Sequence, residues 1–160
     1  MIKSIKTSFP FILNFIVFLC FISPIQAQEF NINDDGVAMH GFDAVSYFGP
    51  TPQSGKTSIS AIYKDHTFLF SSPANREAFL LTPDSYLPQF GGYCAYGVRM
   101  GQKFDVDPEA YTVLDGKLYM LLNRATKELW EKDRERNIGI AQQLWSSIKP
   151  IPAVQLEDNK

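Results

Sequence analysis

Residues 111–120 read Tyr-Thr-Val-Leu-Asp-Gly-Lys-Leu-Tyr-Met and form the clearest local signal in the chain. Two β-rich runs, 112–114 and 117–120, flank the pair Asp115-Gly116. A two-residue type I′ turn needs positive φ at both of its residues, which an Asp-Gly pair tolerates. The stretch therefore predicts a β-hairpin, and the rest of the fold can be built outward from it.

A second hairpin is predicted nearer the N-terminus. Residues 59–63 and 67–71 are β-rich and lie on either side of Lys64-Asp65-His66. In this arrangement His66 is expected at the exposed tip of the hairpin. Residues 45–48 are predicted to form a further short strand.

Helix start signals follow both hairpins. Ser72 is a good N-cap and Pro73 suits a first helical turn, so a helix is predicted after the second strand of the upstream hairpin. Asn123 is expected to cap a helix over residues 124–134. Apolar residues at helical spacing predict an amphipathic helix over 137–148.

The order of these elements indicates the fold class. Strands come in hairpins and helices in separate runs, which favours an α+β fold: a small antiparallel sheet of hairpins with short helices and a C-terminal helical segment. We see no internal repeat in the sequence. The expected organisation is a flexible N-terminus over 28–36, one domain over 37–148 and a disordered tail over 149–160.

Residues 1–27 are typical of an export signal. Lys3 and Lys6 precede an apolar stretch over residues 9–22, and the small Ala27 ends a suitable cleavage site. The apolar run is short for a membrane-spanning helix, which needs about 20 apolar residues. We therefore expect cleavage, a periplasmic or extracellular protein, and no stable membrane insertion after the signal is removed.

Composition argues against one class of partner. The chain has 15 Lys and Arg residues against 17 Asp and Glu residues, for a formal net charge of -2. No run of basic residues appears, so nucleic-acid binding is not expected.

The candidate site centres on Cys94, the one cysteine left after signal cleavage. It lies in the stretch Phe-Gly-Gly-Tyr-Cys-Ala-Tyr-Gly-Val (90–98), where two glycines allow positive φ or a close approach. Cys94 is the candidate soft metal donor, with His40 as co-ligand. Asp43, Tyr93 and Tyr47 are candidate ligand-binding residues, although Asp43 could equally cap a turn and the tyrosines could be core residues.

Several motifs together resemble the YHS domain family. Residues 70–79 read Phe-Ser-Ser-Pro-Ala-Asn-Arg-Glu-Ala-Phe, followed by Pro83 and Tyr86. The exported branch of that family resembles this chain further at 41–48, 91–96, 107–110 and 115–119. The likeness spans about residues 37–145, and it implies a small α+β domain whose biochemical role is poorly defined.

The resemblance departs at two positions that matter for chemistry. Metal-linked family members carry two cysteines where this chain has Ser71 and Asn75. A hydroxyl and an amide are weak neutral ligands compared with thiolates. The usual metal site of the family is therefore expected to be absent, and the cofactor is unknown, with a transition metal ion at Cys94 as a candidate.

Three functions remain open at this point. The first is an exported, non-catalytic binding module that holds a small ligand or metal ion between residues 41–47 and 91–96. The second is a thiol-dependent enzyme or redox sensor using Cys94 and His40. The third is a purely structural or interaction domain. No nucleophile elbow or Gly-rich phosphate loop is present, so an enzyme is the less favoured interpretation.

Overall fold

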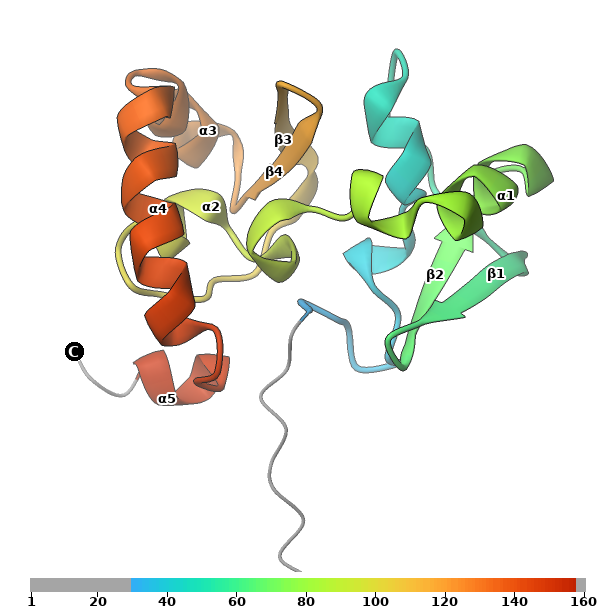
Figure 1. Cartoon of the computed structure of the whole chain (residues 1–160), viewed down its shortest axis with the longest axis horizontal. Helices are drawn as coiled ribbons and strands as arrows, with labels where there is room; N and C mark the ends of the chain where they lie inside the picture. The colour runs from blue at the N-terminus through green and yellow to red at the C-terminus, as the bar shows by residue number, and fades with distance from the viewer. Residues whose placement is uncertain (1–29, 158–160) are drawn as a thin grey trace, which may run out of the picture.

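A computed structural model describes residues 30–157 of this chain, and Figure 1 shows its ribbon. The predicted export signal, residues 28–29 and residues 158–160 lie outside the described residues. The elements form two halves that lie side by side and are joined by the segment between α1 and α2 (Figure 1). The first half comprises η1 (Met39–Gly41), η2 (Ala44–Phe48), β1 (Lys56–Tyr63), β2 (His66–Phe70), α1 (Pro73–Leu81) and η3 (Pro83–Ser85).

The second half continues in the same manner and then adds two helices. It comprises η4 (Gln89–Gly92), α2 (Ala95–Val98), β3 (Asp107–Leu114), β4 (Lys117–Leu121), α3 (Arg124–Glu131), α4 (Arg134–Ile148) and α5 (Ala153–Glu157). Each half holds one two-stranded antiparallel sheet, β1–β2 or β3–β4. The chain is therefore a small α+β fold, as predicted, with two hairpins in two separate sheets.

Both predicted hairpins are present, and the turn at Asp115-Gly116 has the predicted geometry. Asp115 and Gly116 have φ values of 50° and 69°, as a type I′ turn requires. Lys64 and Asp65 have φ values of 48° and 64°, so the first hairpin also turns on two residues. His66 is consequently the first residue of β2, half-buried with its ring against Phe30, and is not the exposed tip that we expected.

The predicted helix caps are also confirmed. The Ser72 side chain accepts a hydrogen bond from the Asn75 backbone N–H at the start of α1. Asn123 does the same for the Thr126 backbone N–H at the start of α3. The C-terminal helix α4 begins at Arg134, three residues earlier than its apolar pattern indicated.

Three further local predictions need correction. Residues 45–48 belong to the 3₁₀ helix η2 and not to a strand, because the Asp43 side chain caps the turn by accepting from the Val45 N–H. Within the segment expected to be flexible, Phe30 is buried and the Asn31 N–H donates to the Gly91 carbonyl.

The third correction concerns the predicted disordered tail. The segment after α4 folds back and forms α5. The Lys103 ammonium, which is buried, donates to the carbonyls of Lys149 and Ile151 at 2.9 and 2.7 Å. The rings of Tyr93 and Trp145 lie 5.2 and 5.4 Å from the same ammonium. These contacts account for the order of residues 149–157, which local sequence does not encode.

The two halves repeat one arrangement, with equivalent residues 51 positions apart. The strands β1 and β3 have eight residues each, β2 and β4 have five, and two residues separate each hairpin from the helix that follows it. The register irregularity falls at the same place, between Lys56 and Ser60 in one hairpin and between Asp107 and Tyr111 in the other. An isolated parallel bridge joins Val37 to Thr67 in the first half and Pro88 to Leu118 in the second.

The repeat extends to unusual backbone conformations. Met39, His40 and Gly41 have φ values of 56°, 52° and 79°, and their counterparts Phe90, Gly91 and Gly92 have 56°, 62° and 80°. Over residues 39–81 and 90–132, the only identical pairs are Gly41/Gly92, Ala44/Ala95, Ala74/Ala125 and Glu77/Glu128. So little identity explains why we saw no repeat in the sequence.

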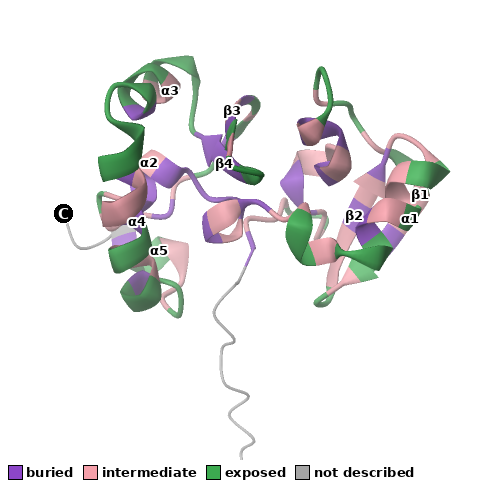
Figure 2. Cartoon of the chain, turned by 45° about the horizontal axis from the view of Figure 1, so that its top comes forward, coloured by how far each residue is buried: buried purple, intermediate pink, exposed green. Residues whose placement is uncertain are grey.

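The core runs through both halves. Figure 2 shows buried residues where each hairpin meets its helices, and exposed residues on the outer sides of α3 and α4. The aromatic rings of Phe68, Phe70 and Phe79 fill the first half. Tyr119 and Trp130 pack in the corresponding place in the second. No helix between residues 30 and 157 has the length and apolar character needed to cross a membrane.

Candidate functional site

Cys94 lies in the core. Its side chain is 0% exposed, and its sulfur accepts hydrogen bonds from the backbone N–H groups of Gly97 and Leu122 at 3.4 and 3.3 Å. Burial raises the pKa of the Cys94 thiol, and the backbone donors oppose this rise only in part. A protonated, inaccessible thiol is neither a good nucleophile nor a good metal ligand.

Asp43 is also 0% exposed, but it holds a network of donors. One carboxylate oxygen accepts from the Val45 N–H at 2.9 Å. The other accepts from the Ser71 N–H at 2.9 Å, the Ser71 hydroxyl at 2.6 Å and the Asn75 amide at 2.6 Å. The two positions that the YHS resemblance aligns with cysteines thus converge on a single carboxylate oxygen.

Asp43 and Cys94 are equivalent residues in the repeat. Each precedes a short helix and accepts a backbone N–H from that helix through its side chain. Each also accepts from the backbone N–H of the residue just after the second strand of its hairpin, Ser71 in one half and Leu122 in the other. Both side chains therefore connect a short helix to a hairpin by hydrogen bonds, which is a structural role.

His40 belongs to a third set of contacts, between the two halves. Its Nε2 lies 2.7 Å from Asp105 Oδ1, and the same oxygen accepts from the Asn31 amide at 2.7 Å and the Val106 N–H at 2.8 Å. Burial alone would raise the pKa of Asp105, but hydrogen bonds from Asn31, Val106 and His40 outweigh it and lower that pKa. His40 therefore pairs with a carboxylate 65 positions away and not with Cys94.

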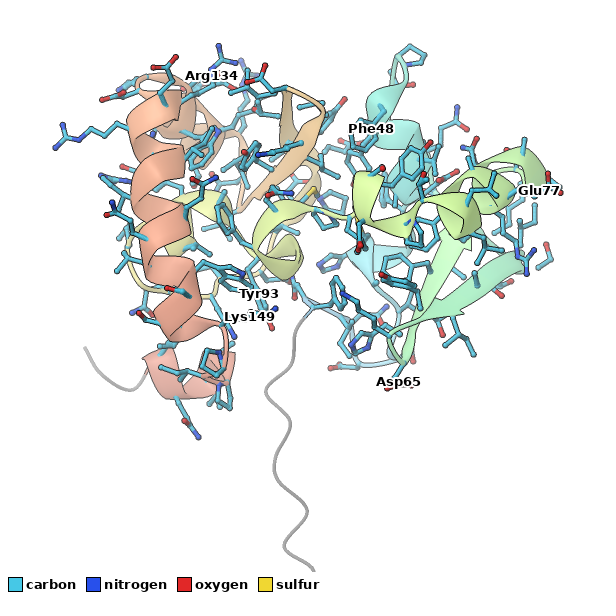
Figure 3. The ribbon with its side chains drawn as sticks, in the orientation of Figure 1. Phe48, Asp65, Glu77, Tyr93, Arg134 and Lys149 are labelled. Atoms are coloured by element: carbon cyan, nitrogen blue, oxygen red, sulfur yellow. The ribbon has the colours of Figure 1, made fainter. Side chains whose placement is uncertain are left out.

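The two candidate tyrosines are core residues that link segments. The Tyr47 hydroxyl donates to the Pro108 carbonyl at 2.9 Å, and burial raises its pKa well above the ordinary value. Burial also raises the pKa of Tyr93. The Tyr93 ring lies under Lys103, and Figure 3 shows Tyr93 and Lys149 together beside α4. Both tyrosines serve packing, the alternative left open by the sequence.

The structure therefore does not gather the predicted site residues around one point. Cys94, Asp43 and His40 each belong to a separate hydrogen-bond network. Within residues 30–157, no group of three or more His, Cys, Asp or Glu side chains is placed to hold a metal ion.

A small hollow lies at Gly91 and Gly92, but no residue of the predicted partner segment 41–47 lines it. Met39 and His40 line it from one side, and Gly91 and Gly92 from the other. Its volume is about 10 Å³. This is about the space of one water molecule, so a small ligand does not fit there.

A larger groove lies in the first half, on the other side of the Asp43 network. Its volume is about 400 Å³, within the range of small-molecule sites. Figure 3 shows Phe48, one of its residues, at the opposite end of the first half from the hairpin turn at Asp65. The groove is lined by apolar Val45, Phe48 and Pro50, by the aromatic ring of Tyr86, by polar Ser46, Thr51, Gln53 and Asn75, and by Gly49.

The sequence analysis did not identify this groove as a site. Among the described residues no charged side chain lines it, and the rings of Phe48 and Tyr86 meet edge-to-face at 5.6 Å. The available signal was that residues 41–48, Asn75 and Tyr86 all belong to the YHS-like motifs. Belonging to these motifs did not reveal which side chains line a common groove.

A larger hollow, of about 690 Å³, lies between β3 and α3 and has a different character. Four carboxylates and two basic side chains line it. Arg124 pairs with Glu128, and Arg134, just outside, pairs with Glu131. Three of its six charged side chains thus take part in surface ion pairs, and such pairs have little energetic weight.

We compared the chain with protein-family models, with curated proteins and with solved structures. The YHS resemblance remains a prediction from the motifs. No family model, no curated protein and no solved structure matches this chain.

Proposed function

We propose that this protein is an exported, YHS-like, non-catalytic binding module that takes a small uncharged ligand in the groove of its first half. The observation that carries the proposal is the lining of that groove: two aromatic rings, two further apolar side chains and four polar ones, with no charge among the described residues. Such a mixture is typical of small-molecule sites.

The groove is also held rigidly. Asn75 is fixed by Asp43, and the Ser46 hydroxyl donates to the Asp43 carbonyl at 2.6 Å and accepts from the Gln53 N–H at 2.8 Å. Side chains locked by such contacts lose little freedom when a ligand binds. A preorganised site of this kind suits binding without chemistry.

A fragment screen by NMR tests this proposal. Neutral, anionic and cationic fragments are titrated into the ¹⁵N-labelled protein. We expect neutral fragments to shift the amide signals of residues 45–53 and 75, with weaker binding to Phe48→Ala and Tyr86→Ala variants. Leu81→Ala, at an exposed leucine that does not line the groove, serves as the control. Neutral fragments that shift only the residues between β3 and α3, or none, would contradict the proposal.

A further inference from the structure

We infer that the ligand of the first-half groove is an uncharged aromatic molecule that carries an N–H or O–H donor. This inference rests on the function proposed above and specifies the class of ligand. It comes from comparing the groove with the equivalent surface of the second half, where the protein supplies its own side chains.

The second half fills the corresponding place with an aromatic ring. Gly97 is the counterpart of Ser46, and Phe104 is the counterpart of Gln53. A Cβ added at Gly97 would lie 2.8 Å from Cδ2 of Phe104, so the phenyl ring rests directly on that glycine. The backbone contact is the same in both halves, since Asp43 N–H donates to the Gln53 carbonyl and Cys94 N–H donates to the Phe104 carbonyl.

The first half keeps the backbone arrangement but has Gln53 in place of that ring, and the Ser46 side chain takes the point where the ring rests on Gly97. The free space of the groove therefore lies beside this point, against Val45 and Gly49. Other large side chains of the second half are also replaced by smaller ones, with Val45 where the second half has Tyr96 and Gly49 where it has Met100. The space that these replacements leave is bordered by the rings of Phe48 and Tyr86. An aromatic ring from a ligand matches this setting in size and in the edge-to-face contacts it can make.

Asn75 indicates the polar part of the ligand. A carboxylate accepts hydrogen bonds and does not donate them, so the Asn75 group that faces Asp43 is its NH₂. This NH₂ also lies 3.3 Å from the Ser71 hydroxyl, which is hydrogen-bonded to the same carboxylate oxygen, so the amide is held in one orientation. Asn75 Oδ1 accepts from no residue between 30 and 157, and it is the group left to bind a ligand donor.

The absence of charged side chains among the described lining residues indicates that the ligand is neutral. An ionised ligand would lose hydration on entering the groove and find no opposite charge among its described lining residues. A neutral ring with one donor loses less hydration and gains both ring contacts and one hydrogen bond. The matching probes are phenol and indole.

The test titrates four small probes and benzoate into the purified protein and follows ¹⁵N amide shifts. Phenol and indole contain a ring and a donor, toluene contains a ring only, and cyclohexanol contains a donor only. We expect phenol and indole to shift the signals of residues 45–53 and 75. We expect toluene, cyclohexanol and benzoate to bind there at least about tenfold more weakly, as the loss of one favourable interaction predicts.

Two variants test the comparison between the halves. Ser46→Gly with Gln53→Phe rebuilds the second-half pairing and should fill the ring position and abolish phenol binding. Gln143→Phe, at an exposed position of α4, is the control for adding a phenylalanine. Asn75→Thr introduces the second-half residue and should weaken phenol binding about tenfold without affecting toluene. Because it alters a single residue, it keeps the test valid if the double variant does not fold.

The outcomes separate this inference from the proposed function. Equal binding of cyclohexanol and phenol in the groove would overturn the aromatic class while leaving a neutral-ligand module intact. Unchanged phenol binding by the double variant would show that the ring position is elsewhere. If none of the neutral probes shifts residues 45–53 or 75, the ligand class is wrong, and the broader fragment screen then decides whether the groove binds at all.

Discussion

At the scale of single residues, the two buried acceptors Asp43 and Cys94 explain most of what the candidate site does. They occupy equivalent positions in the two halves, and each satisfies backbone N–H groups that would otherwise be buried without a partner. Leaving such donors unpaired costs about 1–3 kcal/mol each. The residues that drew attention as chemical groups are thus needed first for the fold.

Cys94 is expected to be protected from alkylation in the folded protein. Its sulfur is fully buried, and its raised pKa keeps the thiol protonated near neutral pH. Mass spectrometry after treatment with iodoacetamide should find modification only once denaturant has unfolded the chain. Comparable labelling rates with and without denaturant would instead restore the thiol-dependent enzyme as a candidate.

Asp43→Asn is expected to lower the free energy of unfolding by about 2–3 kcal/mol, because hydrogen bonds to a charged acceptor are lost and an N–H₂ group is turned toward donors. Urea unfolding followed by circular dichroism measures this change. Asp34→Asn, at an exposed aspartate, is the matched control and should be close to neutral. A loss below about 0.5 kcal/mol for Asp43→Asn would mean that the network is not important for stability.

At the scale of elements, the hairpins and helices form where local signals are strongest, and close packing decides the details. Gly55 lies directly before β1, and an added Cβ would come within 2.5 Å of the Leu69 carbonyl carbon. Gly139 lies within α4, and an added Cβ would meet nothing within 4 Å. Close packing therefore requires glycine at position 55, whereas nothing nearby requires it at position 139.

Alanine substitutions at these glycines should have opposite effects. Gly55→Ala forces the backbone of β2 to move and should destabilise the protein by about 1–3 kcal/mol. Gly139→Ala removes the entropic penalty of a glycine within a helix and should stabilise it by about 0.5–1 kcal/mol. Thermal unfolding of both variants is the measurement, and a shift in the same direction for both would contradict the packing described here.

At the scale of the whole molecule, a few contacts join the two halves. They include the His40–Asp105 pair, the Asn31–Asp105 hydrogen bond, the Tyr47–Pro108 hydrogen bond and the edge-to-face contact of Tyr47 with Tyr111 at 5.0 Å. Two of these four involve Asp105, whose counterpart in the first half is the uncharged Ser54. At the junction, therefore, the two halves of the chain differ in charge.

Asp105 should make stability depend on pH on the acid side. Its folded-state pKa is lowered, so its contribution is present above the unfolded value near 3.9 and is lost as the pH falls through the folded pKa. The side chain is 64% exposed, so solvent screening keeps the effect modest. Urea unfolding should find Asp105→Asn less stable than wild type near about pH 6, with the difference closing toward about pH 3. A constant difference across this range would refute the assignment.

The sequence by itself determined the hairpins, the N-caps of α1 and α3 and the α+β class, because these depend on residues within a few positions of one another. Asp115-Gly116 needs no distant partner to favour its turn, and Asn123 caps the helix that begins beside it. The same local logic failed for residues 45–48, where the Asp43 side chain replaced the expected strand with a 3₁₀ helix.

Only the tertiary structure decided what the candidate residues do. Asp43 meets Asn75 across 32 positions, His40 meets Asp105 across 65, and Cys94 meets Leu122 across 28. Such pairings depend on which faces the folded backbone presents to one another, and no local pattern records them. The repeat was not visible in the sequence for a related reason. The two halves share backbone φ values and packing, and many different side chains are compatible with both.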